Sequence, residues 1–217
     1  MKSSEPKIRV MLVDDHDVVR TGTRLLLEQD GRFEVIQEAD SGSAALEAFV
    51  SSRPDVIVLD LNLRGMSGLE VTRQLLKQDP LARILVFSIH QERVYIAKAL
   101  EAGAQGYLCK SAPAEEMIEA IYRIGCGGSL TPSPGPFRGR GRSTAADPLT
   151  ALTVREFEVF QLLAQGADSR EIASTLGWSL KTASNYTLTI KEKLGVSSTA
   201  ELVSLAVRWS TLQQNTP

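Results

Sequence analysis

The sequence predicts two domains of different fold classes: an α/β domain with a doubly wound, five-stranded parallel sheet, then a small all-α domain of four helices. Over residues 8–125, short apolar strand-like runs alternate with helix-like segments, which is typical of repeated βα units. Residues 126–148 are rich in Gly, Pro and Arg and predict a linker. Residues 149–210 show helical patterns throughout. The predicted domains are therefore residues 1–125 and 149–217.

Five apolar runs mark the strands of the α/β domain. They cover residues 8–13, 33–38, 56–59, 83–88 and 105–110. The third run is apolar at every position from Val56 to Leu59, as expected for a strand buried on both faces. A helical pattern follows each strand, and Pro113 stands where the first turn of the last helix would begin. Such βα units return the chain to the same edge and build a parallel sheet.

The predicted linker contains three arginines, at positions 138, 140 and 142. Pro and Gly at this density do not hold a helix or bury a core. A solvated spacer is the favoured interpretation, and contact of these arginines with phosphates is the alternative.

The all-α domain carries clear helix start signals. Two predicted capping boxes pair a hydroxyl with a glutamate three residues later, a third has the same shape with aspartate as the cap, and one serine caps a further helix. These signals are Thr153 with Glu156, Ser198 with Glu201, Asp168 with Glu171, and Ser179.

Composition restricts the class of protein. Apolar residues make up 43% and charged residues 23% of the 217 residues, as in ordinary globular proteins. No apolar run approaches the about 20 residues of a membrane span, and the first residues lack the apolar stretch of a secretory signal. Cys109 and Cys126 are too few for a disulfide framework and lack zinc-site spacing. We therefore expect a cytoplasmic protein without a membrane partner.

Polar side chains stand at the ends of four predicted strands: Asp14 with Asp15, Asp60, Ser88 and Lys110. The carboxyl ends of parallel strands lie on one edge, so these residues can converge. Clustered carboxylates favour a hard divalent cation such as Mg²⁺. A lysine and a serine beside them suit the capture of a phosphoryl group by a carboxylate. Taken singly, each residue could instead cap a helix, end a strand or be solvated.

Together with Tyr107, these residues resemble the motif of a two-component receiver domain, which has a flavodoxin-like fold, over residues 8–125. The resemblance implies that Asp60 is the phosphoacceptor for a sensor histidine kinase. It also implies that Asp15, Asp60 and the main-chain carbonyl of Asn62 ligate Mg²⁺, with Asp14 close by through water. Ser88 and Lys110 would hold the phosphoryl oxygens, and Ser88 and Tyr107 would form the switch pair.

The chain departs from the receiver pattern in the loop after Asp60. Leu63-Arg64 stands where many receivers have Met-Pro, which places a cation near the phosphoryl site. Ser111 replaces the proline that follows the lysine in many receivers. We interpret His16 as a loop residue and not as a ligand.

Residues 149–210 resemble a LuxR-type helix-turn-helix, so that the whole chain is similar to a response regulator of the NarL/FixJ type. The recognition helix would begin at Lys181, with Ala183, Tyr186 or Thr187, Ile190 and Leu194 on its inner face. Its predicted DNA contacts are Lys181, Thr182, Ser184, Asn185, Leu188, Lys191 and Lys193. Asn185 suits adenine and Leu188 a thymine methyl, while the lysines suit phosphates.

Two of these positions lack the expected charge. The family usually has a basic residue at the place of Ser184 and often one near Leu188. Residues 151–217 hold six basic and six acidic residues, so we expect this domain alone to bind DNA weakly.

We predict a transcriptional regulator that phosphorylation of Asp60 switches toward a dimer on promoter DNA. The apolar last helix, residues 200–209, would supply the dimer contact, and RNA polymerase would be a further partner. The first alternative is an interaction adaptor with weakened or lost DNA binding. An aspartate-dependent phosphohydrolase is disfavoured, because Asn62 stands where such an enzyme has its general acid.

Overall fold

The computed structural model describes residues 6–130 and 147–214, with side chains up to residue 211. The chain divides into two compact units, Met1–Arg140 and Gly141–Pro217, and each is described by itself. No helix within the described residues is long and apolar enough to cross a membrane.

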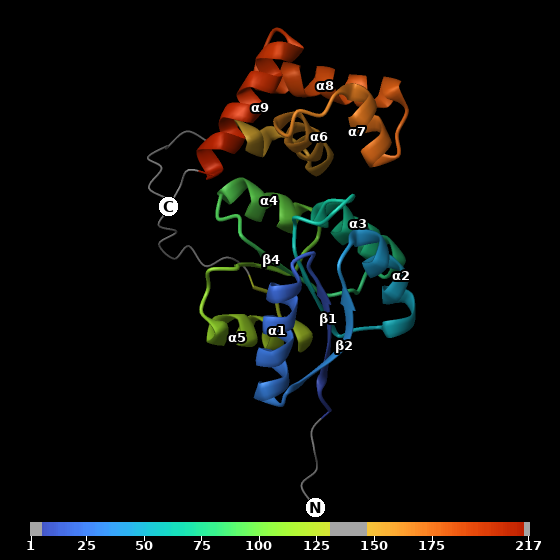
Figure 1. Cartoon of the computed structure of the whole chain (residues 1–217), viewed down its shortest axis with the longest axis vertical. Helices are drawn as coiled ribbons and strands as arrows, with labels where there is room; N and C mark the ends of the chain where they lie inside the picture. The colour runs from blue at the N-terminus through green and yellow to red at the C-terminus, as the bar shows by residue number, and fades with distance from the viewer. Residues whose placement is uncertain (1–5, 131–146, 215–217) are drawn as a thin grey trace, which may run out of the picture. The chain divides into compact units, whose positions relative to one another are not determined.

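The first unit is built on one five-stranded sheet (Figure 1). All strand pairs are parallel and the order is β2-β1-β3-β4-β5. The strands are β1 (Ile8–Val13), β2 (Phe33–Ala39), β3 (Val56–Leu59), β4 (Ile84–Ser88) and β5 (Gly106–Cys109). This confirms the predicted doubly wound α/β fold. Because β3 lies between β1 and β4, its four residues are fully buried, as their apolar run predicted.

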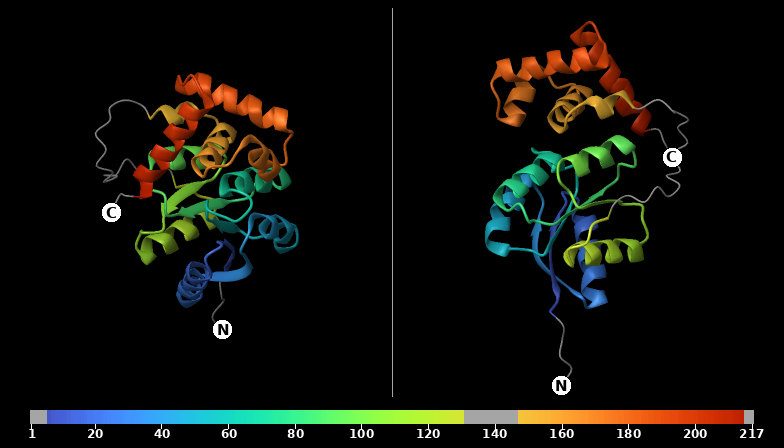
Figure 2. Two further views of the ribbon diagram at one scale, coloured as in Figure 1. Left: turned by 45° about the horizontal axis from the view of Figure 1, so that its top comes forward. Right: turned by 180° about the vertical axis from the view of Figure 1, so that it is seen from behind.

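Helices cover both faces of this sheet, with α1 and α5 on one face and α2, α3 and α4 on the other (Figures 1 and 2). They are α1 (Asp17–Asp30), α2 (Gly42–Ser52), α3 (Gly68–Gln78), α4 (Arg93–Glu101) and α5 (Ala114–Gly125). On the α1–α5 face, Leu27 and Ile121 pack with strand residues such as Leu12 and Val58 in one apolar cluster.

The packed part of the first unit extends beyond the boundary predicted at residue 125. The Leu130 side chain lies against the apolar cluster, and its amide donates to the Gln105 carbonyl at 2.9 Å. The predicted linker thus begins with five residues that remain attached to the sheet domain. Residues 131–146, including the three arginines, lie outside the described residues.

The second unit is all-α, as predicted. A short 3-10 helix η1 (Pro148–Ala151) precedes α6 (Val154–Ala164), α7 (Ser169–Leu176), α8 (Leu180–Leu194) and α9 (Thr199–Gln214). The capping boxes at Thr153 and Asp168 are complete, and Ser179 caps α8. The third predicted box is only half formed, because the Glu201 carboxylate accepts from the Ser197 amide instead of the Ser198 amide.

Most of the apolar side of α9 is used inside this unit. Leu202 and Ala206 are fully buried, and the Trp209 ring packs edge-on against Phe157 and Phe160 at centroid distances of 5.8 and 5.7 Å. Val207 stays 43% exposed. The surplus of apolar residues that suggested a dimer contact is therefore smaller than the sequence indicated.

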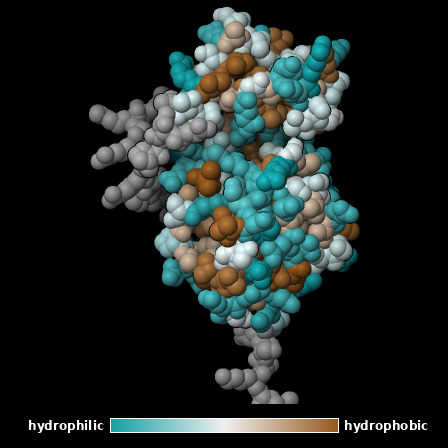
Figure 3. All heavy atoms as spheres, in the orientation of Figure 1, coloured by the Kyte–Doolittle hydropathy of each residue, from teal (hydrophilic) through white to brown (hydrophobic). Residues whose placement is uncertain are grey.

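Large apolar side chains that are exposed among the described residues lie at separate places in the sequence. On the face drawn in Figure 3 they stand among hydrophilic side chains. Exposed Val18 lies on α1, Val50 on α2, and Leu81 in the loop between α3 and β4, and such scattered exposure is ordinary for a globular surface.

Candidate functional site

The carboxyl edge of the sheet brings together the side chains predicted there. Asp14 and Asp60 each stand one residue beyond a strand, and Lys110 follows β5. Their amides still bond to neighbouring strands: Asp60 N–H donates to the Val13 carbonyl at 2.9 Å and Lys110 N–H to the Ser88 carbonyl at 2.8 Å. Hydrogen bonds to neighbouring strands therefore hold the backbone in place where each functional side chain projects.

Lys110 bridges two buried carboxylates. Its Nζ lies 2.7 Å from Asp14 Oδ2 and 2.7 Å from Asp60 Oδ2. Burial raises the pKa of Asp60, and the lysine only partly offsets this increase. Burial lowers the pKa of Lys110, but its bonds to the two carboxylates outweigh this effect and the pKa is raised overall. The ammonium thus stays charged where negative charge accumulates.

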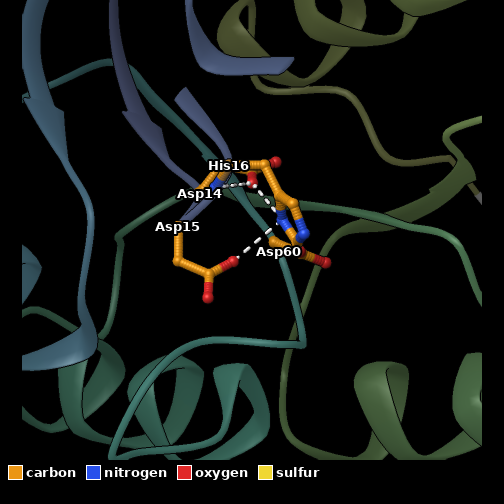
Figure 4. Close-up of side chains that lie close together, drawn as sticks. All are labelled: Asp14, Asp15, His16 and Asp60. Atoms are coloured by element: carbon orange, nitrogen blue, oxygen red, sulfur yellow. Dashed lines mark hydrogen bonds and ion pairs between the residues drawn. The ribbon is translucent and has the colours of Figure 1, made fainter. Parts of the chain in front are cut away.

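Asp15 and His16 complete an acidic cluster with Asp14 and Asp60 (Figure 4). The His16 Nδ1 lies 2.9 Å from Asp15 Oδ1 and 3.2 Å from Asp14 Oδ1, and its amide donates to Asp14 Oδ1 at 2.8 Å. His16 is a loop residue, as interpreted, but it also orients both carboxylates. Its sequence position beside the acidic pair was the signal for this contact.

The donor set fits a hard divalent cation. One potential ligand atom from each of the four residues lies within 4.8 Å of the others. Asp60 Oδ1 is buried and has no hydrogen-bond partner among the residues that the structure describes. A buried carboxylate oxygen without a donor is costly, whereas carboxylate oxygens are the ligands that Mg²⁺ prefers.

Ser88 and Tyr107 both form hydrogen bonds with the main chain of His90. Ser88 is fully buried and its Oγ accepts from the His90 amide at 3.4 Å. The half-buried Tyr107 donates its hydroxyl to the His90 carbonyl at 2.7 Å. Burial raises the Tyr107 pKa, against the opposing effect of Ser88.

Sequence reasoning missed the position of His90. Its ring stacks on Tyr95 of α4 at a centroid distance of 3.8 Å, and its Nε2 lies 3.1 Å from the Asn62 Oδ1. Burial, together with the nearby Lys110 charge, lowers its pKa to about 4. His90 therefore joins the loop after β3 to α4 as a neutral ring.

Gly68 is a second residue that the sequence did not single out. It begins α3, after the N-cap Ser67, and its amide donates to the Leu61 carbonyl at 2.9 Å. A Cβ at this position would lie 2.1 Å from the Asp60 carbonyl oxygen. Only glycine lets the start of α3 approach the Asp60 backbone this closely.

Arg64, the departure noted in the loop after Asp60, reaches the rim of the cluster. Its side chain is 84% exposed and its Nε lies 3.6 Å from Asp15 Oδ2. This is a solvated ion pair, which contributes little to stability.

In the second unit, α7 and α8 pack together and are joined by a tight turn. Gly177 ends α7 with φ = 67°, in the left-handed region. Trp178 follows and stacks on Tyr186 at 4.6 Å, so the turn is held against α8. This arrangement is a helix-turn-helix.

The faces of α8 are largely as predicted. Ala183, Thr187 and Ile190 are buried, so that Thr187 and not Tyr186 takes the inner position that the sequence left open. The predicted outer positions Lys181, Ser184, Asn185 and Leu188 are all exposed.

Three further predicted DNA contacts lie nearer the body of the domain. Thr182 is half-buried and its hydroxyl bonds with Ser179 Oγ at 2.8 Å. Lys191 is half-buried. The Lys193 Nζ lies 2.7 Å from the Glu156 carboxylate, which ties this lysine to α6.

The two units define a class of protein: a regulator in which an α/β domain with an acidic, lysine-bridged site precedes a helix-turn-helix domain. Residues 10–122 match the model of the response regulator receiver domain, and residues 150–206 match bacterial regulatory proteins of the luxR family. The chain belongs to the two-component response regulators of the LuxR family, which regulate transcription and are not enzymes.

Relatives match over almost the full length. The transcriptional activator protein ExaE of Pseudomonas putida is 40% identical over 91% of this chain and 95% of that protein. The response regulator GacA of Pseudomonas aeruginosa is 34% identical over 93% of this chain and 96% of that protein.

Solved structures agree on the fold. A two-component response regulator of the LuxR family from an Aurantimonas species is 41% identical, with a TM-score of 0.56, over 58% of this chain and 91% of that one. RcsB from Salmonella enterica serovar Typhimurium, bound to a promoter in the presence of the phosphomimetic BeF3⁻, has a TM-score of 0.73 at 23% identity, over 93% of this chain and 98% of that one. The latter likeness concerns the fold alone.

Proposed function

We propose that this response regulator is switched by Mg²⁺-dependent phosphorylation of Asp60 and then binds promoter DNA as a dimer in the cytoplasm. A sensor histidine kinase is the phosphodonor, and RNA polymerase is a further partner at the promoter. The observation that carries the proposal is the lysine bridge: Lys110 Nζ lies 2.7 Å from both Asp14 and Asp60, while Asp60 Oδ1 is buried without a hydrogen-bond partner among the described residues.

The chemistry follows from these positions. An Asp60 carboxylate oxygen attacks the phosphorus of a phosphohistidine, an O–P bond forms as the N–P bond breaks, and the departing imidazole takes up a proton. Lys110 leaves Asp60 Oδ2 for a phosphoryl oxygen and keeps its contact with Asp14. Ser88 donates to another phosphoryl oxygen, and Tyr107 then gives up its bond to the His90 carbonyl.

A Mg²⁺ ion would be held by Asp15, Asp60 and the Asn62 carbonyl, with Asp14 nearby through water. It would supply charge neutralisation for the phosphoryl oxygens. The orphan Asp60 Oδ1 and the cluster of carboxylates support this site.

Phosphate incorporation tests the proposal. The full-length protein with Mg²⁺ and a radiolabelled small-molecule phosphodonor should take up close to one phosphate per chain, and Asp60→Asn should take up none. Asp40→Asn is the matched control, because Asp40 is an exposed carboxylate directly after β2. Equal labelling of wild type and Asp60→Asn would refute Asp60 as the acceptor, and uptake independent of Mg²⁺ would refute the metal.

A second candidate, an adaptor with weakened DNA binding, rests on the α8 surface. Ser184 and Leu188 are uncharged, and Lys193 is paired with Glu156. A gel-shift assay across a genomic fragment library, with phosphorylated protein at low salt, separates the two functions. Absence of any shift would favour the adaptor.

A further inference from the structure

The middle of the outer face of α8 lacks the side chains that most often select guanine. Between Lys181 and Lys191 no residue is charged, and the exposed positions Ser184, Asn185 and Leu188 are neutral. Arginine or lysine bonded to guanine O6 and N7 is the commonest base-specific contact in DNA recognition. The stretch of the outer face between these two lysines, at Ser184, Asn185 and Leu188, therefore offers guanine no cation.

Leu188 is an apolar residue of this face and is 51% exposed, as is Leu180 at the start of the helix, at 49%. It lies away from the buried stripe of Ala183, Thr187 and Ile190, so it does not support the domain core. A lone exposed leucine is ordinary on a protein surface. Leu188 differs because its neighbours on the same face, Asn185 and Ser184, are hydrogen-bonding side chains suited to base edges.

The spacing of Asn185 and Leu188 allows contact with neighbouring base pairs. Three residues advance a helix by about 4.5 Å, which lies between one and two of the about 3.4 Å steps that separate base pairs. An asparagine pairs with adenine N6 and N7, and an aliphatic side chain packs on the thymine methyl. The next exposed residue one turn on, Glu192, is acidic, which confines base contacts to the N-terminal part of the helix, where such motifs make them.

We propose that α8 selects A·T pairs at two neighbouring positions of each half-site, with Asn185 on an adenine and Leu188 against the 5-methyl group of a thymine. This inference rests on the proposed DNA-binding function and specifies its ligand: duplex DNA recognised at these positions through a methyl group and an adenine edge. G·C pairs are disfavoured there because neither Asn185 nor Leu188 offers guanine O6 and N7 a cation.

The test begins with site selection. Full-length protein, incubated with Mg²⁺ and a small-molecule phosphodonor, is used to enrich binding sites from a random duplex library. The enriched half-sites should share A·T pairs at two neighbouring positions. Each conserved thymine is then replaced by deoxyuridine, which removes only the methyl group, and the affinity is measured at fixed salt.

For wild type, deoxyuridine at the contacted position should weaken binding about fourfold, the value of one buried methyl group. Leu188→Ala protein should bind the thymine and deoxyuridine sites equally. Asn185→Ala should keep the deoxyuridine effect but lose preference for adenine, on the order of tenfold. Leu81→Ala is the matched control, since Leu81 is an exposed leucine between α3 and β4 and its truncation should leave the deoxyuridine effect intact.

The outcomes distinguish a failure of this inference from a failure of the proposed DNA-binding function. If no sequence is enriched, both the DNA-binding function and the inference fail. Enriched sites with G·C pairs at the contacted positions, or equal affinity of wild type for thymine and deoxyuridine at every position, overturn the inference while DNA binding stands. If Leu188→Ala weakens both sites by the same factor and retains the deoxyuridine effect, Leu188 contacts something other than the methyl group, and the inference is wrong.

Discussion

The edge of the receiver sheet and the outer face of α8 present their side chains in opposite ways. Asp14, Asp60 and Lys110 are buried or nearly so and bond to one another, whereas Asn185 and Leu188 on α8 are exposed. A buried polar site depends on its own fold, because each charge needs its partner. The exposed side chains of α8 gain bonding partners only when a ligand binds. Substitutions at the sheet edge should therefore change stability and chemistry together, while those on α8 should change binding alone.

The largest expected effect comes from Gly68→Ala. The added Cβ would lie 2.1 Å from the Asp60 carbonyl oxygen, so the start of α3 must move away from Asp60. We expect the free energy of unfolding of the receiver unit to fall by about 3 kcal/mol and phosphate incorporation to be lost. Denaturant unfolding followed by circular dichroism, together with the labelling assay, measures both.

Gly22→Ala is the control for this substitution. Gly22 lies within α1 with no atom within 4 Å of an added Cβ, so alanine should stabilise the unit by about 0.5 to 1 kcal/mol. Normal phosphate incorporation by a stable Gly68→Ala protein would show that the close approach of α3 is unnecessary.

His90 gives the receiver site a dependence on pH. Its pKa of about 4 lies below the ordinary value of 6.5, so the folded state resists its protonation. The associated stability is fully present above pH 6.5 and is lost as the pH falls to about 4, by about 3 kcal/mol in all. Relative to His90→Gln, wild type should lose that amount over this window. Parallel stability curves for the two proteins between pH 6.5 and 4 would contradict a half-buried His90 ring that is neutral in the folded state.

The sequence predicted those features that follow from local pattern and topology. Runs such as Val56 to Leu59 identify parallel strands, and parallel strands place Asp14, Asp60 and Lys110 on one edge. The buried stripe of α8 followed from helical spacing, although spacing alone left the choice between Tyr186 and Thr187 open.

The features that were missed depend on contacts between distant segments. The role of His90 follows from its contact with Asn62, which lies 28 residues earlier in the chain, and no sequence pattern connects the two residues. Gly68 owes its importance to one close backbone approach. Lys193 looks like a phosphate contact until Glu156, 37 residues away, is placed beside it.

A moderate effect is expected at a helix cap of the second unit. Thr153 accepts from the Glu156 amide and completes the capping box of α6, so Thr153→Ala should destabilise this unit by about 1 kcal/mol. Trp178 and Trp209, the two tryptophans of the chain, both belong to this unit, so tryptophan fluorescence reports its unfolding separately. Thr175→Ala, at an exposed position inside α7, is the control and should change little. Equal losses in the two variants would argue against the cap.

The smallest effects distinguish two lysines of α8. Lys193 is paired with Glu156 at 2.7 Å, and Lys193→Gln should cost the second unit about 0.5 kcal/mol with little change in DNA affinity. Lys181 is exposed at the start of the helix, and Lys181→Gln should leave stability unchanged while weakening DNA binding at all sequences and reducing its salt slope by about 1. Salt titrations of DNA affinity, with thermal unfolding of each variant, measure the difference. If Lys193→Gln instead weakened DNA binding and Lys181→Gln did not, Lys193 would leave Glu156 for a phosphate when DNA binds. In that case a side chain paired within the domain would also serve the ligand, and the contrast between the two kinds of site would not hold for α8.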